Sequence, residues 1–149
     1  MSAEVPTTIP ALEVRRRVPA PPQAVFDTWT DPEQVRHWLG GSATSVPQAS
    51  IDLREGGHYE YTVTSPEGVN SKIRGTFLTI REPDQLIFTW IIENEAGRSP
   101  ETKVSVEFRK MGNETEVVIV HQGFLDLGVR AAHEGGWDGC LDVIITLLN

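Results

Sequence analysis

Between residues 46 and 122 the sequence consists of short alternating segments that are separated by turn-forming residues. The breaks are rich in Gly, Pro, Asn and Asp, as in Glu55-Gly56-Gly57, Pro66-Glu67-Gly68, Glu82-Pro83-Asp84, Glu95-Ala96-Gly97 and Met111-Gly112-Asn113. Six strands fit between these breaks. Because a parallel return needs a crossover of about a dozen residues or more, such short connections predict an antiparallel meander.

One face of this sheet is predicted to be apolar, because successive side chains of a strand point to opposite faces. The inward positions are Ile51 and Leu53; Tyr59, Tyr61 and Val63; Ile73, Gly75 and Phe77; Leu86, Phe88 and Trp90; Val104, Val106 and Phe108; and Val117, Ile119 and His121. After Gly128 the period becomes helical, and a single stripe is formed by His133, Trp137, Leu141, Ile144 and Leu148. A helix over residues 129–148 is long enough to lie across the sheet.

The segment before the meander supplies one strand and two short helices. Residues 12–18 alternate as a strand that prolines stop. A first helix carries Val25, Phe26 and Trp29 at helical spacing, and a second helix begins at Asp31, which serves as its N-terminal cap. The sequence therefore predicts an α+β fold, in which a curved antiparallel sheet of six to seven strands wraps around a long C-terminal helix.

Length and composition suit one globular domain. The 149 residues are 39% hydrophobic and 23% charged, close to the average of globular proteins. Residues 1–9 lack hydrophobic periodicity and are predicted to be a flexible tail before a domain of residues 10–149. Neither a signal peptide nor a run of about 20 apolar residues is found, so we expect a cytoplasmic protein without membrane insertion.

The charge balance weighs against nucleic acid as a partner. Thirteen basic and 21 acidic side chains give a formal net charge of −8, and such a surface repels phosphate backbones. The one basic cluster, residues 15–17, would be divided between the two faces of a strand. We therefore expect no nucleic-acid partner, and a protein that is a monomer or a weak homodimer.

A set of short motifs is similar to one known family over roughly residues 11–148. The motifs are Arg16 followed by Ala20-Pro21, Val25-Phe26 with Trp29, Asp31-Pro32-Glu33 before Trp38, Gly56-Gly57 before Tyr59 and Tyr61, Gly75, Pro83 before Leu86 and Trp90, His121, and Gly136-Trp137 before Leu141. They resemble the bacterial stand-alone relatives of the C-terminal domain of the heat-shock-protein-90 ATPase activator, within the START-like (SRPBCC) helix-grip superfamily. The resemblance implies the helix-grip fold and an internal cavity, and it supplies no catalytic residues.

Aromatic side chains dominate the predicted interior. Seven of them face the space between sheet and helix: Tyr59, Tyr61, Phe77, Phe88, Trp90, Phe108 and Trp137. They could line a pocket for a flat or apolar ligand, or they could simply fill the core. A curved sheet and a straight helix do not close-pack along their whole length, which favours a pocket. Trp38 is predicted to gate its mouth, and Leu141 of the helical stripe completes the apolar part of the ligand-binding set.

Three polar side chains are further candidates for ligand contacts. Arg16 shares the inward face of the first strand, so its guanidinium needs an anionic partner. We favour an internal acid such as Glu60 or Glu107 over a ligand anion. His121 ends the last strand on the inward face, and His133 begins the helical stripe. Each is either a hydrogen-bonded core group or a residue that orients a ligand or moves a proton.

The sequence predicts neither a metal site nor a cofactor. Cys140 and His133 are seven residues apart, which separates them by about 10.5 Å along a helix and excludes a catalytic dyad. His37, His58 and His121 lie on separate elements, so they do not form a metal site. The leading hypothesis is the non-catalytic binding of a small apolar or aromatic molecule. The alternatives are a cyclase- or hydrolase-like enzyme and a chaperone-type interaction module.

Overall fold

The computed structural model describes residues 9–41 and 43–149. Its elements are, in chain order, β1 (Leu12–Val18), α1 (Pro22–Thr30), α2 (Pro32–Trp38), β2 (Ser45–Ile51), β3 (His58–Thr64), β4 (Asn70–Arg81), β5 (Gln85–Asn94), β6 (Gly97–Arg98), β7 (Thr102–Met111), β8 (Glu114–Gln122) and α3 (Leu127–Leu148). The predicted tail lies outside the described residues apart from Ile9, which is half-buried and packs against the core. Packing against the core thus reaches one residue beyond the predicted boundary.

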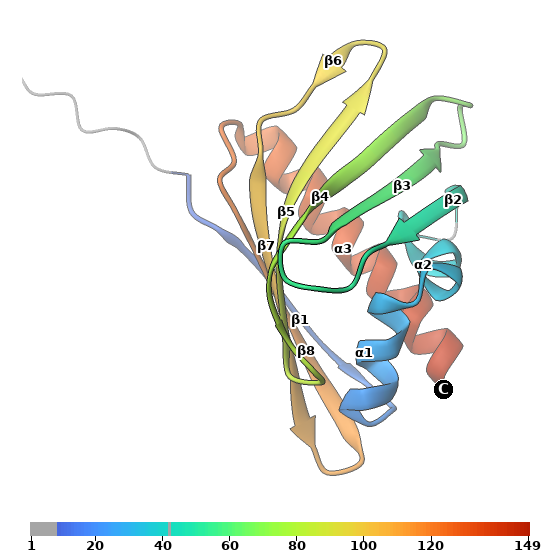
Figure 1. Cartoon of the computed structure of the whole chain (residues 1–149), viewed down its shortest axis with the longest axis vertical. Helices are drawn as coiled ribbons and strands as arrows, with labels where there is room; N and C mark the ends of the chain where they lie inside the picture. Colours follow the sequence, from blue (N-terminus) through green and yellow to red (C-terminus); the bar gives the residue numbers. More distant parts are fainter. Residues whose placement is uncertain (1–8, 42) are drawn as a thin grey trace, which may run out of the picture.

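The strands form one antiparallel sheet in the order β1-β8-β7-β5-β4-β3-β2, and β6 pairs with β5 outside this order. Figure 1 shows the sheet curving around α3. The first strand of the chain pairs with the last one, since β1 lies beside β8. This arrangement confirms the predicted α+β helix-grip fold. The sheet has eight strands where six to seven were predicted, because the turn after β5 contains the two-residue strand β6.

The concave face of the sheet carries the apolar side chains that alternation predicts. Tyr59, Phe88 and Val106 are buried there on three different strands. Leu53 is an exception, because β2 ends at Ile51 and leaves Leu53 beyond the strand with 40% of its surface exposed. The predicted inward place of Leu53 is therefore wrong, since alternation has no meaning once the strand has ended.

At Gly75, β4 comes very close to β5. A Cβ atom on Gly75 would lie 1.9 Å from the carbonyl oxygen of Thr89 and 2.8 Å from the hydroxyl oxygen of Tyr59. That hydroxyl donates a hydrogen bond to the same carbonyl oxygen. The pairing register between β4 and β5 shifts just beyond this point. A glycine is therefore required here, because the Tyr59 side chain and the neighbouring strand occupy the space of a side chain.

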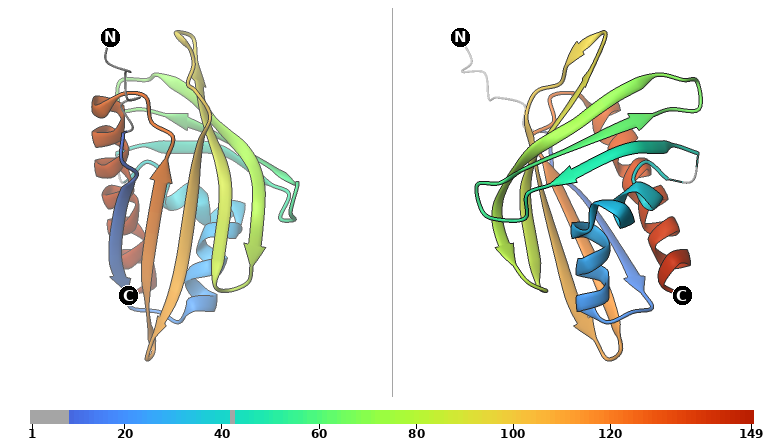
Figure 2. Two further views of the ribbon diagram at one scale, coloured as in Figure 1. Left: turned by 90° about the vertical axis from the view of Figure 1, so that its left-hand side faces the viewer. Right: turned by 45° about the vertical axis from the view of Figure 1, so that its right-hand side comes forward.

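Helix α3 lies against the concave face with its apolar stripe toward the sheet. Asp126 caps its first turn by accepting a hydrogen bond from the Val129 N–H at 3.0 Å. Trp137, Leu141 and Ile144 are buried, as the stripe predicts. The helix comes close to β1 along one flank and to α2 along the other, and Figure 2 shows β1 running beside it. Side chains from the middle strands fill the span between these two flanks.

Helices α1 and α2 lie beside the C-terminal part of α3 (Figure 1). Asp31 separates them and caps α2, since its carboxylate accepts a hydrogen bond from the Glu33 N–H at 3.0 Å. Phe26 and Trp29 of α1 and Val35 of α2 are buried, which seals this end of the core. Of the three helices in residues 9–41 and 43–149, none is long and apolar enough to cross a membrane.

Candidate functional site

Aromatic rings fill the interior between the middle strands and α3. Ring centroids lie 5.0 Å apart for Tyr59 and Tyr61, and 6.1 Å apart for Phe77 and Phe88. The space left among the rings measures about 10 Å³, which is the size of one water molecule. We call this part the packed region; it is bounded by Trp29, Trp38, Leu39, Tyr59, Tyr61, Phe77, Leu86, Phe88, Trp90 and Trp137. The interior that we expected to be hollow is thus filled at this place.

Nine members of the predicted ligand-binding set belong to the buried core, and Trp38, Phe108 and Leu141 are among them. The Trp38 side chain is buried, and its indole N–H donates to the Thr28 carbonyl oxygen at 2.9 Å. Phe108 packs edge-on against Phe26 with ring centroids 5.7 Å apart, and Leu141 is fully buried. The expected mouth at Trp38 is therefore wrong, because the indole is held inside by its hydrogen bond.

An apolar cleft lies beside the packed region, where α3 faces β4 and β5. Its volume is about 170 Å³. Its walls are Leu39, Gly40, Ile73, Trp90, Ala132, His133, Gly136, Trp137 and Cys140. Small residues provide the room: Ala132, Gly136 and Cys140 follow one another at four-residue spacing on one face of α3. Of the predicted set, Trp90, His133 and Trp137 line this apolar cleft.

His121 is fully buried behind the cleft wall. The Trp137 indole N–H donates to its Nδ1 at 3.1 Å, and its Nε2 lies 2.7 Å from the Thr102 hydroxyl oxygen. That hydroxyl donates to the Trp90 carbonyl oxygen at 3.2 Å, so we assign the imidazole proton to Nε2. Burial, with a smaller contribution from His133, lowers the pKa of His121 to about 3. The ring is therefore neutral, with both nitrogens bonded.

His133 is half-buried and links α3 to β5. Its Nδ1 lies 2.9 Å from the Val129 carbonyl oxygen, which can only accept, so Nδ1 carries the proton. Its Nε2 then accepts the Trp90 indole N–H at 3.2 Å. The two rings meet edge-on, with centroids 6.2 Å apart. Both imidazole nitrogens are thus engaged with protein groups.

Arg16 lies at the border between β1 and α3. Its guanidinium is 2.8 Å from the Asp142 carboxylate and 3.9 Å from that of Asp138, and 35% of its side chain is exposed. The expected partners Glu60 and Glu107 are instead paired with Lys72 and Arg109. The favoured ion pair with an acid of the protein is confirmed. The two acids named for it were wrong, because α3 passes β1 closely enough for acids on its polar face to reach the arginine. Such exposed pairs contribute roughly 0–1 kcal/mol.

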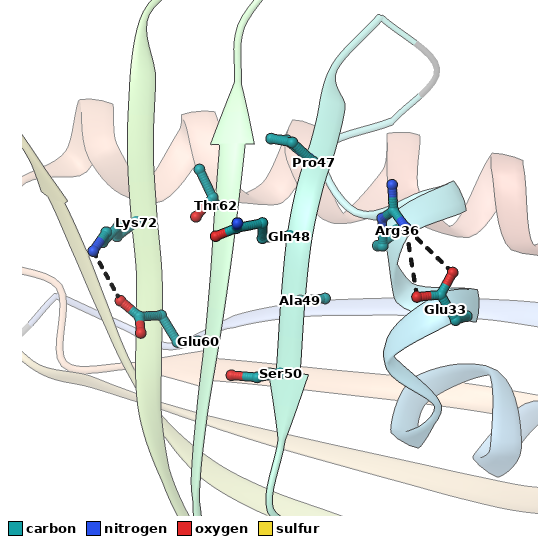
Figure 3. A pocket seen from close by; sticks show the side chains of 9 residues that line it. All are labelled: Glu33, Arg36, Pro47, Gln48, Ala49, Ser50, Glu60, Thr62 and Lys72. Carbon is teal, nitrogen blue, oxygen red and sulfur yellow. Dashed lines mark hydrogen bonds and ion pairs between the residues drawn. The ribbon is translucent and has the colours of Figure 1, made fainter.

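A larger, polar groove on the outer face of the sheet was missed by the sequence analysis. Its volume is about 380 Å³, and it lies between α2 and strands β2 to β4 (Figure 3). Lys72 pairs with Glu60 at 3.3 Å, and Arg36 pairs with Glu33 at 3.2 Å. Its charged groups thus neutralise one another in solvent. Alternation indicates which strand residues face outward, but it gives no sign that α2 packs beside β2.

The thiol of Cys140 also borders the apolar cleft. It is buried, and it accepts a hydrogen bond from the Gly40 N–H at 3.3 Å. Burial raises the pKa of Cys140 to about 11, so the thiol stays protonated at neutral pH. Within residues 9–41 and 43–149, no group of three or more His, Cys, Asp or Glu side chains is placed to hold a metal ion.

The fold is shared with solved bacterial proteins of low sequence identity. A protein from Nitrosomonas europaea has a TM-score of 0.78 at 24% identity, covering 93% of this chain and 94% of that one. A protein from Chromobacterium violaceum has a TM-score of 0.82 at 18% identity, covering 94% and 98%. An AHSA1 protein from Silicibacter pomeroyi has a TM-score of 0.81 at 23% identity, covering 93% and 96%. No curated protein matches the chain. At these identities the likeness shows the fold alone.

The family of this chain is shown by its sequence rather than by its fold. A family model described as Activator of Hsp90 ATPase homolog 1-like protein matches residues 19–149. This range contains every element after β1, and it includes all the walls of the apolar cleft. The chain belongs to the Activator of Hsp90 ATPase homolog 1-like family.

Proposed function

We propose that the protein binds one small apolar molecule, about the size of a single aromatic ring, in the apolar cleft. The observation that carries the proposal is the size of the cleft together with its lining. Its volume of about 170 Å³ is close to the roughly 150 Å³ of an engineered apolar cavity that stays dry and binds benzene. Trp90 and Trp137, with ring centroids 5.1 Å apart, offer aromatic surface to a flat ligand.

The polar groups of the lining are already bonded, which favours an apolar ligand over a polar one. His133 uses both ring nitrogens, on Val129 and on Trp90. The sulfur of Cys140 accepts the Gly40 N–H. A charged or strongly polar ligand would lose water on entering and gain few hydrogen bonds in return, at a cost of several kcal/mol.

A cyclase- or hydrolase-like enzyme that uses the same cleft is an alternative with less support. Such a mechanism needs a base and an electrophilic group that converge on one ligand atom. His121 is bonded at both nitrogens behind the cleft wall, and Arg16 pairs with Asp142 away from the lining. A chaperone-type role, which the family's name suggests, is a second alternative. It is tested by measuring the ATPase rate of a heat-shock-protein-90 with and without this protein.

The binding proposal is tested by titrating the ¹⁵N-labelled protein with toluene and following the backbone amides by NMR. Three proteins are compared: the wild type, Gly136→Leu and Gly135→Leu. A helical side chain leans toward the N-terminus of its helix. A leucine at 136 would thus extend over Ala132 in the cleft wall, whereas a leucine at 135 would extend over Ala131, which is not part of the lining.

We expect saturable shifts of the Gly136 and Cys140 amides in the wild type, with toluene binding in the micromolar to millimolar range. Gly136→Leu should weaken toluene binding at least about tenfold, because its side chain occupies the cleft. Gly135→Leu should bind as the wild type does, because it changes helix propensity equally without touching the cleft. Equal binding by both variants, or no saturable shift in the wild type, would overturn the proposal.

A further inference from the structure

A second, smaller cleft continues the line of the apolar cleft along α3. It lies at the N-terminal end of the helix, has a volume of about 80 Å³, and is bordered by Pro100, Phe124, Leu125 and Val129 among others. We call it the end cleft. Two residues, Trp90 and His133, line both spaces. The side chains of this pair therefore form the wall between the two clefts.

The wall is a single hydrogen-bonded pair. The Trp90 indole N–H donates to the His133 Nε2 at 3.2 Å, and this bond joins β5 to α3 across the gap. The Trp90 indole of β5 packs against the Trp137 ring of α3, with ring centroids 5.1 Å apart. On the α3 side the imidazole is fixed by the Val129 carbonyl one turn earlier, at 2.9 Å. The rings of His121 and Phe124 also lie against the imidazole, with centroids 5.1 Å and 5.2 Å away.

We infer that His133 is a specificity-determining residue. Its imidazole separates the apolar cleft from the end cleft, and this limits the site to ligands of about one ring. The inference rests on the proposed function. Both spaces are lined mainly by carbon, although Ser99, Thr102 and Asp126 also border the end cleft. Val129 at one end and Cys140 at the other are eleven residues apart, about 16 Å along the helix. Without the imidazole, one continuous channel of about that length would accept an elongated apolar molecule.

The test compares a one-ring probe, toluene, with a two-ring probe, biphenyl, by the same NMR titration. His133→Ala removes the imidazole. His133→Gln keeps a side chain of similar length whose amide oxygen can accept the Trp90 N–H. Trp90→Phe removes the donor and serves as a second way to open the wall if the alanine variant does not fold. The melting temperature of each variant is measured alongside.

We expect the wild type to bind toluene at least about tenfold more tightly than biphenyl. His133→Ala should shift the toluene-to-biphenyl affinity ratio at least about tenfold toward biphenyl. Because His133 also lines the apolar cleft, the affinity for toluene is expected to fall in this variant, and the ratio is therefore the measure. His133→Gln should keep the wild-type ratio, because its amide oxygen can still accept the Trp90 N–H. Loss of a merely structural residue would weaken the binding of both probes and leave their ratio unchanged. Trp90→Phe should shift the ratio in the same direction as His133→Ala.

The outcomes separate the two proposals. Toluene binding with the same toluene-to-biphenyl ratio in the wild type and His133→Ala would leave the proposed function in place and overturn the partition. A wild type that already accepts biphenyl as tightly as toluene would also overturn it. If neither probe binds to the wild type or to His133→Ala, the proposed function fails, and the inference that rests on it fails as well.

Discussion

The packed region and the apolar cleft lie side by side under the same sheet, yet only the apolar cleft leaves space for a small molecule. In the packed region, every wall contributes a large side chain, and about 10 Å³ is left. At the apolar cleft, α3 presents Ala132, Gly136 and Cys140 to the same sheet, and about 170 Å³ is left. Trp90 and Trp137 border both spaces. The small residues of the helix, and not the number of aromatic rings, therefore decide where this fold leaves room.

The largest effect that we expect from a single methyl group is at Gly75 in the packed region. In Gly75→Ala the new Cβ would lie 1.9 Å from the Thr89 carbonyl oxygen, so β4 and β5 must separate. We expect a loss of more than about 4 kcal/mol in the free energy of unfolding, or no folded protein. Urea denaturation followed by circular dichroism measures it. Combining the substitution with Tyr59→Phe should bring no recovery, because the clash with the carbonyl remains; a loss below about 1 kcal/mol would contradict close packing here.

Trp137 borders both regions, so its removal should affect stability and binding together. Trp137→Ala is expected to lower the free energy of unfolding by roughly 3–5 kcal/mol, the usual cost of truncating a large buried aromatic. It should also abolish toluene binding. Trp137→Phe keeps most of the ring but leaves the His121 Nδ1 without its donor, so a smaller loss of about 1–3 kcal/mol is expected. A loss below about 1 kcal/mol for the alanine variant in urea denaturation would show that the ring is not part of a packed core.

The neutral His121 behind the cleft wall predicts a loss of stability in acid. Its folded-state pKa is about 3, below the ordinary value of about 6.5, so the unfolded chain binds the proton more readily. The stabilisation is fully present above pH 6.5 and is lost as the pH falls from there toward 3, by up to ~1.4 kcal/mol per pH unit. Urea denaturation at several pH values measures this slope. His121→Gln, whose amide can accept from Trp137 and donate to Thr102, should show a shallower slope; equal slopes would contradict the assignment.

Most of the fold could be predicted from the sequence because it depends on local periodicity. Alternation between close turns predicts the antiparallel meander, and the stripe that contains Trp137 and Ile144 predicts the buried face of α3. The error at Leu53 arose at the end of a strand, where alternation stops carrying information. The two-residue strand β6 was missed because it is too short to show any period.

The site was predicted less well, because it depends on distances between elements that are far apart in the sequence. The inward register of β1 was correct for Leu12 and Val14, but it does not reveal that α3 brings Asp142 to Arg16. The hydrogen bond from Trp90 to His133 likewise joins residues 43 positions apart. A signal for the cleft was present in the sequence, since Ala132, Gly136 and Cys140 follow one face of the predicted helix. Their small size, rather than the aromatic residues opposite, was the informative feature.

The smallest effect is expected when the glycine-to-alanine change made at Gly75 is made at Gly136 in the apolar cleft. Apart from its chain neighbours and the nearby backbone of α3, a Cβ atom on Gly136 would meet no atom of the described residues within 4 Å, and the same holds for Gly135 in the preceding position. Both residues are exposed within α3, so each change to alanine should raise the free energy of unfolding by roughly 0.5–1 kcal/mol through helix propensity.

Only the methyl group at 136 borders the apolar cleft, so Gly136→Ala alone should weaken toluene binding, by a few-fold, while Gly135→Ala should leave it unchanged. Urea denaturation and the toluene titration measure the two effects on the same samples. If Gly136→Ala is instead destabilising while Gly135→Ala is stabilising, the space beside Gly136 is filled in solution. The contrast between an open and a packed half of the interior would then be lost.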